Sequence, residues 1–340
     1  MNKRRLSNSD PDLFRLIVVT ILIFVAMTAL KPDKFLSKAN FSSMCYQIPE
    51  IGLYTLAMML ILVTGQTDIS SVAIGNLCTI TGITIMSQAT KNNVTGAAAW
   101  LYILGALIVM LLIGVVCGLV NGFTVTYFKV PTMLVTMATS SIFRGIAVVA
   151  TEGNALTGAP EELTYFGNHG FLGIAYAMWF FLIIFVVVAY LMNRTKFGME
   201  LRFIGSNEKA SEYAGINVNK TLLKAYVYSG VIAALTGFEI IARTDAAKYD
   251  YGGSYVNQAL LACVLGATNP DGGYVRMACI ALGLASVQFL SSGFNLLRLG
   301  GNVKQFAWGA LLVFVVCFDV LNRELRRKKA IRDVAKKHNS

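Results

Sequence analysis

Long apolar runs separated by short charged segments constrain this chain more than any other feature. A helix rises about 1.5 Å per residue, so about 20 apolar residues cross the roughly 30 Å hydrocarbon core of a membrane. The chain has runs of this kind at 13–30, 44–64, 69–88, 98–127, 132–150, 171–192, 222–242, 256–269, 274–293 and 303–322. The eighth run is too short to cross as one straight helix, and we interpret it as a half-span completed by the glycine-rich turn after it. The pattern predicts one all-α, polytopic membrane domain with about ten transmembrane helices.

The composition argues against a soluble protein. Of the 340 residues 56% are apolar and only 14% are charged, whereas a soluble domain is about half apolar and about a quarter charged. The six cysteines form no C-x-x-C pair and lie in or beside apolar runs, which indicates small buried hydrophobes rather than disulfides or metal ligands. His169 and His338 are the only histidines, so we predict no metal site.

The net charge of +11 lies mainly beside apolar runs, at Lys3, Arg4 and Arg5 and in the basic tail 323–340. Basic residues in such places set orientation and contact anionic headgroups, so we expect membrane lipid, and no nucleic acid, as a partner. With the N-terminus inside, about 20 of the 29 Lys and Arg residues fall on the inner side. An even number of spans then returns the C-terminus to the cytoplasm.

Catalytic and nucleotide-binding motifs are missing from the sequence. It contains no G-x-x-x-x-G-K-[ST] loop, no H-E-x-x-H motif and no combination of residues that would form a Ser-His-Asp triad. We therefore predict that the chain is not an enzyme. The classes that remain are channels, secondary transporters, receptors and the membrane parts of driven pumps.

The longest inner loop, 193–221, predicts a short cytoplasmic helix at about 206–217. Asn207 is a good N-cap, Glu208 suits the positive start of a helix, and Gly215 is a good stop. Ala210, Tyr213 and Ala214 would share one small apolar face. A helix this short is unstable alone, so we expect it to dock on the membrane domain or on a partner protein.

Four segments, taken together, resemble the permease subunits of ribose-type ABC importers, in the branched-chain permease superfamily. The first is the loop core with Gly205, Asn207, Ala210, Ala214, Gly215 and Ile216. The others are Thr64-Gly65-Gln66-Thr67-Asp68-Ile69-Ser70, Asn121-Gly122 followed by Lys129-Val130-Pro131, and the late turn 265–273. These matches occur in the family's order over some 250 residues, which makes the resemblance specific.

The resemblance implies a division of labour. Two permease subunits, identical or different, would form a pathway for a pentose, a hexose or a sugar-like signal molecule across the bacterial cytoplasmic membrane. Separate ATPase subunits would hold ATP and Mg²⁺ and drive alternating access, this chain would bind no cofactor, and an extracytoplasmic protein would deliver the solute. The helix at 206–217 would be the coupling helix, with Gly205, Asn207, Glu208, Ala210, Tyr213, Ala214, Gly215 and Ile216 at the ATPase contact.

The sequence departs from the family pattern at two of these segments. Gln66 and Thr67 stand where the family has Gly and Ile, and Ala267 and Val275 stand where it has Gly. Added side chains near tight turns change how closely helices approach. A divergent substrate and a heterodimer with a more typical second subunit are both consistent with these departures.

Polar residues within the spans are functional candidates, and each has a structural alternative. The pathway or gating candidates are Asp68, Asn121, Arg144 and Asn269. Asp68 either caps a helix or acts in gating. Arg144 either faces a watery pathway or pairs with a carboxylate such as Glu50 or Glu239. Glu239 and Arg243, one turn apart, would be able to pair with each other.

The fourth span carries a stripe of small residues, Gly114, Gly118 and Gly122. Such stripes allow close helix approach in membranes, and we favour packing within the chain over a dimer seam.

Two other classes of protein remain open. A secondary transporter would need ion-coordinating groups at mid-membrane beside discontinuous helices, and the short eighth span gives this reading some support. A structural or assembly protein would fit the composition but would leave the capped cytoplasmic helix without a role.

Overall fold

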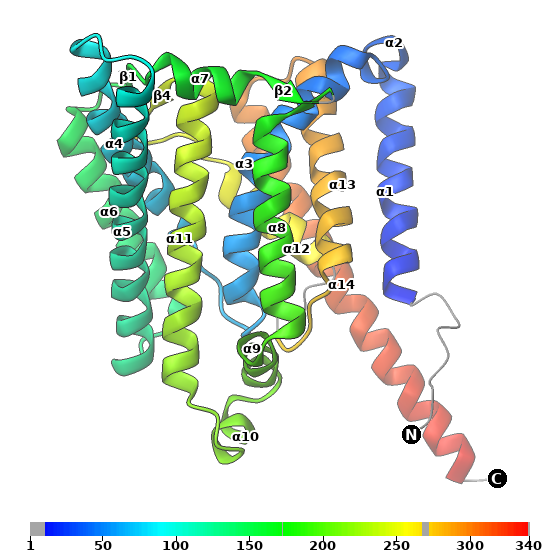
Figure 1. Ribbon diagram of the computed structural model, residues 1–340. Coiled ribbons are helices and arrows are strands. Elements are labelled where there is room, and N and C mark those ends of the chain that lie inside the picture. Colours follow the sequence, from blue (N-terminus) through cyan, green and yellow to red (C-terminus); the bar gives the residue numbers. More distant parts are fainter. Residues whose placement is uncertain (1–10, 172, 267–271, 339–340) are drawn as a thin grey trace.

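The computed structural model describes residues 11–171, 173–266 and 272–338, and it is a bundle of helices standing side by side (Figure 1). Its helices are α1 Pro11–Leu30, α2 Pro32–Phe35, α3 Lys38–Leu62, α4 Ser71–Lys91, α5 Ala97–Tyr127, α6 Thr132–Thr151, α7 Glu161–Asn168, α8 Tyr176–Arg194, α9 Lys196–Ser206, α10 Glu208–Tyr213, α11 Val218–Thr244, α12 Tyr255–Leu265, α13 Met277–Leu296 and α14 Gly301–His338. The prediction of an all-α membrane protein is confirmed.

Strand structure in the described residues is limited to two short antiparallel pairs. Strand β1 (Leu156–Thr157) pairs with β4 (Ala246–Ala247), and β2 (Gly170–Phe171) pairs with β3 (Ile174–Ala175). Both pairs lie with α7 at the end of the bundle opposite α10 (Figure 1). By the distribution of basic residues this is the outer side, so the strands brace the outer loops.

Nine helices in the described part of the chain are long and apolar enough to cross a membrane. The tenth crossing is broken, because α12 has only 11 residues. The chain before α12 descends into the bundle without helical structure. The side chain of Asn76 in α4 donates hydrogen bonds to the carbonyl oxygens of Tyr249 and Tyr251 (3.1 and 3.0 Å). Asn76 lies 15 residues, and thus roughly 20 Å, from the outer end of α4, so these carbonyl groups lie deep in the bundle.

The broken crossing keeps the number of crossings even. The first turn of α1 and the last turn of α14 accordingly lie at the same end of the bundle as α10 (Figure 1). The predicted span 256–269 is therefore a half-helix at 255–265 preceded by an irregular segment, and its last three residues lie outside the described part of the chain. Irregular backbone at this depth is tolerated only where protein surrounds it or where it lines a water-filled cavity.

Helices α3, α4, α5 and α11 form the centre of the bundle, where α11 packs on the other three. Gly114 and Gly118 of α5 lie against the backbone carbonyls of Gly230 and Tyr226 of α11. Without a Cβ at these positions, the two helix backbones come into direct contact, which is how helices associate in lipid. The glycine stripe thus serves packing within the chain, as predicted.

Peripheral helices expose most of their apolar side chains, as expected for helices in contact with lipid or with other subunits. α14 is continuous for 38 residues, about 57 Å, so the helix extends well beyond the hydrocarbon core into the predicted tail 323–340. Four of the six cysteines, Cys78, Cys117, Cys263 and Cys279, are buried, and all six are free thiols. The prediction of buried cysteines holds for these four, whereas Cys45 is half-buried and Cys317 is exposed.

Candidate functional site

The inner loop folds into two short helices, α9 and α10, at the cytoplasmic end of the bundle (Figure 1). Asn207 lies between them in an extended conformation, and its Oδ1 accepts a hydrogen bond from the amide of Ala210 (2.9 Å). Gly215 ends the turn after α10 with a φ of +83°. Local sequence therefore sets both limits of α10, which at Glu208–Tyr213 is shorter than the predicted 206–217.

The surface of α10 is almost entirely exposed. Ala210, Tyr213 and Ala214 face solvent together, with 93% of Tyr213 accessible, and Ser211 is the one buried residue of the helix. The side of Ala210 and Ala214 continues into a groove of about 400 Å³ between α9 and α10. Met199 and Phe203 of α9 line this groove and are more than half exposed. Ile216 is half-buried and also lines the groove.

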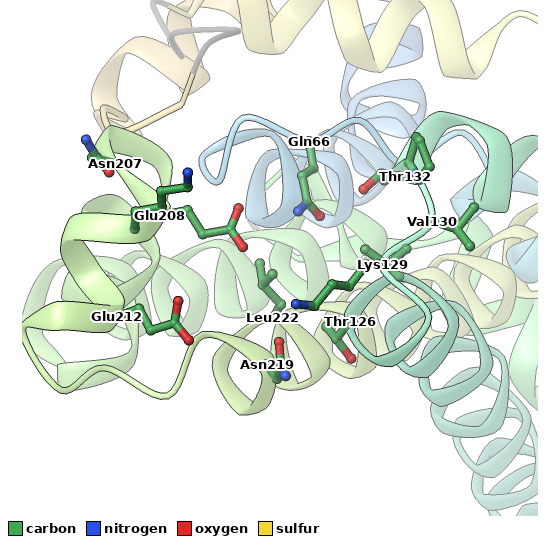
Figure 2. A pocket seen from close by; sticks show the side chains of 13 residues that line it. Gln66, Thr126, Lys129, Val130, Thr132, Asn207, Glu208, Glu212, Asn219 and Leu222 are labelled. Carbon is green, nitrogen blue, oxygen red and sulfur yellow. The ribbon is translucent and has the colours of Figure 1, made fainter.

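A second, more polar pocket of about 650 Å³ opens on the other side of α10 (Figure 2). It separates α10 from the α5–α6 turn, and the side chains of Lys129, Glu208 and Glu212 extend toward it from the two sides. Lys129 has a φ of +51°, a conformation that non-glycine residues rarely adopt. Gln66 also lines this pocket, and its Oε1 accepts a hydrogen bond from the Tyr226 hydroxyl (3.1 Å).

Asp68 and Asn121, two of the predicted candidates, meet in one buried polar cluster. Asp68 Oδ1 accepts hydrogen bonds from the amide (2.8 Å) and hydroxyl (2.6 Å) of Ser70, and Oδ2 accepts one from Ser229 (3.2 Å). Asn121 Nδ2 donates to the same Ser70 hydroxyl (2.7 Å). The cluster joins the non-helical segment after α3 to α5 and α11. Asp68 accepts a hydrogen bond from the backbone amide two residues on, just before α4, which is similar to the capping role that the sequence offered as an alternative to gating.

Arg243, near the outer end of α11, pairs with Glu50 of α3 and not with Glu239. Its Nε donates to Glu50 Oε1 at 2.5 Å, and Nη2 forms an ion pair with the same oxygen. Tyr251 and Tyr255 donate their hydroxyls to the Glu50 carboxylate, Tyr255 at 2.6 Å. This network holds the broken crossing against α3 and α11. Sequence spacing suggested the neighbour Glu239, whose buried carboxylate has no hydrogen-bond partner among the described residues.

Arg144 and Asn269 are not part of these clusters. Arg144 is exposed on α6, beside the buried stripe of that helix, and pairs with neither Glu50 nor Glu239. Asn269 falls outside the described residues.

The polar residues that sequence reasoning missed are Ser229 and the two tyrosines of the Glu50 network. They stand in apolar or loop segments with no distinctive spacing. Within the ranges that the structure describes, no three His, Cys, Asp or Glu side chains gather in a way that would hold a metal ion.

Comparison of the sequence with known proteins identifies relatives of this chain. The L-arabinose ABC transporter permease protein AraH of Azospirillum brasilense is 26% identical, and the match covers 93% of this chain and 90% of that protein. The autoinducer 2 import system permease protein LsrD of Salmonella typhimurium is 31% identical over 78% of this chain and 79% of LsrD. The ribose import permease protein RbsC of Escherichia coli is 28% identical over 89% and 92% of the two chains.

No solved structure matches the chain. The family model described as "Branched-chain amino acid transport system / permease component" matches residues 40–316. This range runs from the start of α3 into α14 and includes α9, α10 and all the polar clusters described above. The chain is a multi-pass membrane protein that belongs to the branched-chain transport permease family.

Proposed function

We propose that this chain is the membrane-spanning permease subunit of an ABC importer that carries a sugar or sugar-like solute across the bacterial cytoplasmic membrane. The observation that carries the proposal is the similarity over most of the chain to the import permeases for L-arabinose, autoinducer 2 and ribose. All three relatives carry small polar cargo, so we expect a cargo of that class. An extracytoplasmic binding protein would deliver the solute.

The driving partner would be a pair of ATPase subunits that hold ATP and Mg²⁺, and α10 would be the coupling helix that contacts them. The exposure of Tyr213, Met199 and Phe203 at the cytoplasmic end of the bundle supports this assignment. Apolar side chains that gather on a water-facing surface mark a contact with another protein. The groove between α9 and α10 is continuous with the exposed side of α10 and would form part of the same contact.

A second permease subunit, identical or homologous, would cover the exposed side of α6. Arg144 supports this placement, because an arginine exposed to lipid at this depth is costly and such residues face a protein or a watery cavity. Asp68 and Asn121 would stabilise the irregular segment beside the inner pocket and so act in gating through backbone position. Asn269 stays a candidate on sequence grounds alone.

Reconstitution tests the proposed function directly. The chain, reconstituted with an ATPase subunit and a binding protein from the same organism, should give ATP-dependent uptake of labelled L-arabinose, ribose or autoinducer 2 in proteoliposomes. The chain alone should transport none of them under a proton or sodium gradient. Gradient-driven uptake by the chain alone would instead identify a secondary transporter, the class that the broken crossing at α12 would suit.

A double substitution tests the coupling helix. Glu208→Ala with Tyr213→Ala should uncouple ATP hydrolysis from uptake and weaken co-purification of the ATPase. The matched control is Glu161→Ala with Tyr165→Ala, another exposed Glu and Tyr pair on the outer helix α7, which should leave co-purification unchanged. Unchanged coupling in the Glu208 and Tyr213 variant would refute the assignment.

A further inference from the structure

Three segments that are far apart in the sequence meet at one point beside α9, at the cytoplasmic end of the bundle. They are the turn after α3 with Val63 and Gly65, the last turn of α9 with Gly205, and the Gly272-Gly273 turn that leads into α13. The amide of Gly273 donates a hydrogen bond to the carbonyl oxygen of Val63 (2.8 Å). We refer to this meeting point as the glycine junction.

Contacts at the glycine junction are between backbones. A Cβ added to Gly205 would collide with the Val63 carbonyl oxygen and the Gly273 amide. A Cβ added to Gly272 would lie 2.6 Å from the Gly65 amide nitrogen and 2.8 Å from the Gly205 Cα. Gly272 also has a φ of +90°, which side-chain-bearing residues rarely adopt. The segments therefore touch without any flexible side chain between them.

This arrangement defines how α10 is attached to the rest of the molecule. Ser211 is the only buried residue of α10, and Asn207 joins α10 directly to the last residue of α9, Ser206. Gly205 precedes Ser206 and lies in the junction. A displacement of α10 thus acts first on the end of α9, and there it meets the backbones of the segments that end α3 and begin α13.

The helices beyond the junction surround the broken crossing. α3, α12 and α13 pack on one another, and α3 carries Glu50, which accepts the hydrogen bonds of Tyr251 and Tyr255. The other links run to α11 and are made by side chains and a loop. The Thr221 hydroxyl of α11 donates to Glu200 of α9 (2.9 Å), and Ile204 of α9 packs with Val218 and Leu222 of α11 in a small buried apolar cluster. Residues 214–217 connect α10 to α11 without helical structure. Side-chain links and loops yield more readily than packed backbones.

We propose that Gly205 and Gly272 are positioning residues for transport, because the glycine junction transmits the displacement of α10 to α3 and α13 and so to the broken crossing. This inference rests on the proposed function, since it takes an ATPase to be what displaces α10. It adds the route inside this chain: the force passes through α9 and not through the 214–217 connection to α11.

Insertions on the two sides of α10 distinguish these routes in the intact complex. Two glycines inserted after Ser206 separate α10 from the junction, and two inserted after Ile216, beyond the last residue of the proposed ATPase contact, loosen its connection to α11. The readout is the number of solute molecules taken up per ATP hydrolysed in the same proteoliposomes. The insertion after Ser206 should lower this ratio about tenfold or more, whereas the insertion after Ile216 should change it less than about twofold. The reverse order, or equal losses, would overturn the proposal.

Point substitutions then locate the route at the junction. Gly205→Ala should lower the same ratio while the ATPase still co-purifies and hydrolyses ATP. The matched control is Gly105→Ala, a helical glycine whose added Cβ would meet nothing within 4 Å. Thr221→Val removes the α9–α11 side-chain bond and should leave the ratio unchanged.

Size-exclusion chromatography gives the amount of folded complex, to which the uptake and hydrolysis values of every variant are normalised. Thermal melting checks that each variant complex is folded. A well-folded Gly205→Ala complex with wild-type coupling would refute the role of the junction. If that variant does not fold, the insertion pair decides, because neither insertion alters the junction itself. Failure of the wild-type complex to couple hydrolysis to uptake would count against the proposed function instead.

Discussion

Replacing Glu50 by Gln should destabilise the bundle by about 3 kcal/mol. Three side chains donate to the Glu50 carboxylate, which is 1% exposed: Arg243, Tyr251 and Tyr255. Removing one partner of a buried ion pair costs about 3–5 kcal/mol. The Arg243 side chain is 22% exposed and recovers part of its solvation, which places the expected cost at the lower end. Gln keeps the shape of the side chain, so the loss measures charge and hydrogen bonding and not a cavity.

The assay is reversible unfolding in mixed micelles with an increasing fraction of sodium dodecyl sulfate, followed by tryptophan fluorescence. Glu161→Gln on the exposed surface of α7 is the matched control and should change stability by less than about 0.5 kcal/mol. In the double variant with Arg243→Gln, the costs should be less than additive, because each single substitution already breaks the same pair. A cost below about 1 kcal/mol for Glu50→Gln, or strict additivity, would show that the network is not what holds the broken crossing.

Three further predictions concern packing, capping and the buried polar cluster. Gly118→Leu should prevent close contact of α5 with α11 and abolish a monodisperse peak in size-exclusion chromatography, whereas Gly105→Leu, on the exposed side of the same helix, should not. Asn207→Ala removes the cap of α10 and should cost about 1 kcal/mol of local helix stability, seen as faster amide hydrogen exchange over 208–213 and weaker ATPase co-purification. Asn207→Asp, which keeps the cap, should restore both. Asp68→Ala leaves the donors of Ser70 and Ser229 without their acceptor and should lower the thermal midpoint more than Asp250→Ala, which removes a 42% exposed carboxylate paired with Lys248. Equal midpoints would contradict the role of the cluster.

The broken crossing shows where sequence reasoning reached its limit. The run 256–269 was too short for a full span, which correctly predicted a half-span. A segment before α12 also contributes to this crossing and descends beside α4, where Asn76 binds its carbonyl oxygens, while most of the predicted turn after α12 lies outside the described residues. An irregular segment has no periodic pattern, so its depth in the membrane is decided by the polar groups that satisfy its backbone.

The candidate residues divide in a similar way. Asn207 and Gly215 limit α10 through local backbone chemistry, and this was predictable because caps act over three or four residues. The pairing of Arg243 with Glu50 was not predictable, since the two are 193 positions apart and the sequence offered the neighbouring Glu239. Arg144 is exposed on α6 and does not pair with Glu50, which binds Arg243 instead, so its role in a pathway stays a prediction.

By itself the sequence determined the properties that depend on short stretches of chain: the apolar spans, the cytoplasmic side of both ends, the capped loop helix and the glycine stripe of α5. Hydrophobic length, basic loops and caps act locally, so these can be deduced without knowing the neighbours. Only the tertiary structure decided which distant groups meet, above all the glycine junction of Gly65, Gly205 and Gly272 and the carboxylate of Glu50 at the broken crossing. Those contacts depend on how the helices pack, and packing is fixed by complementary surfaces that a single sequence does not display.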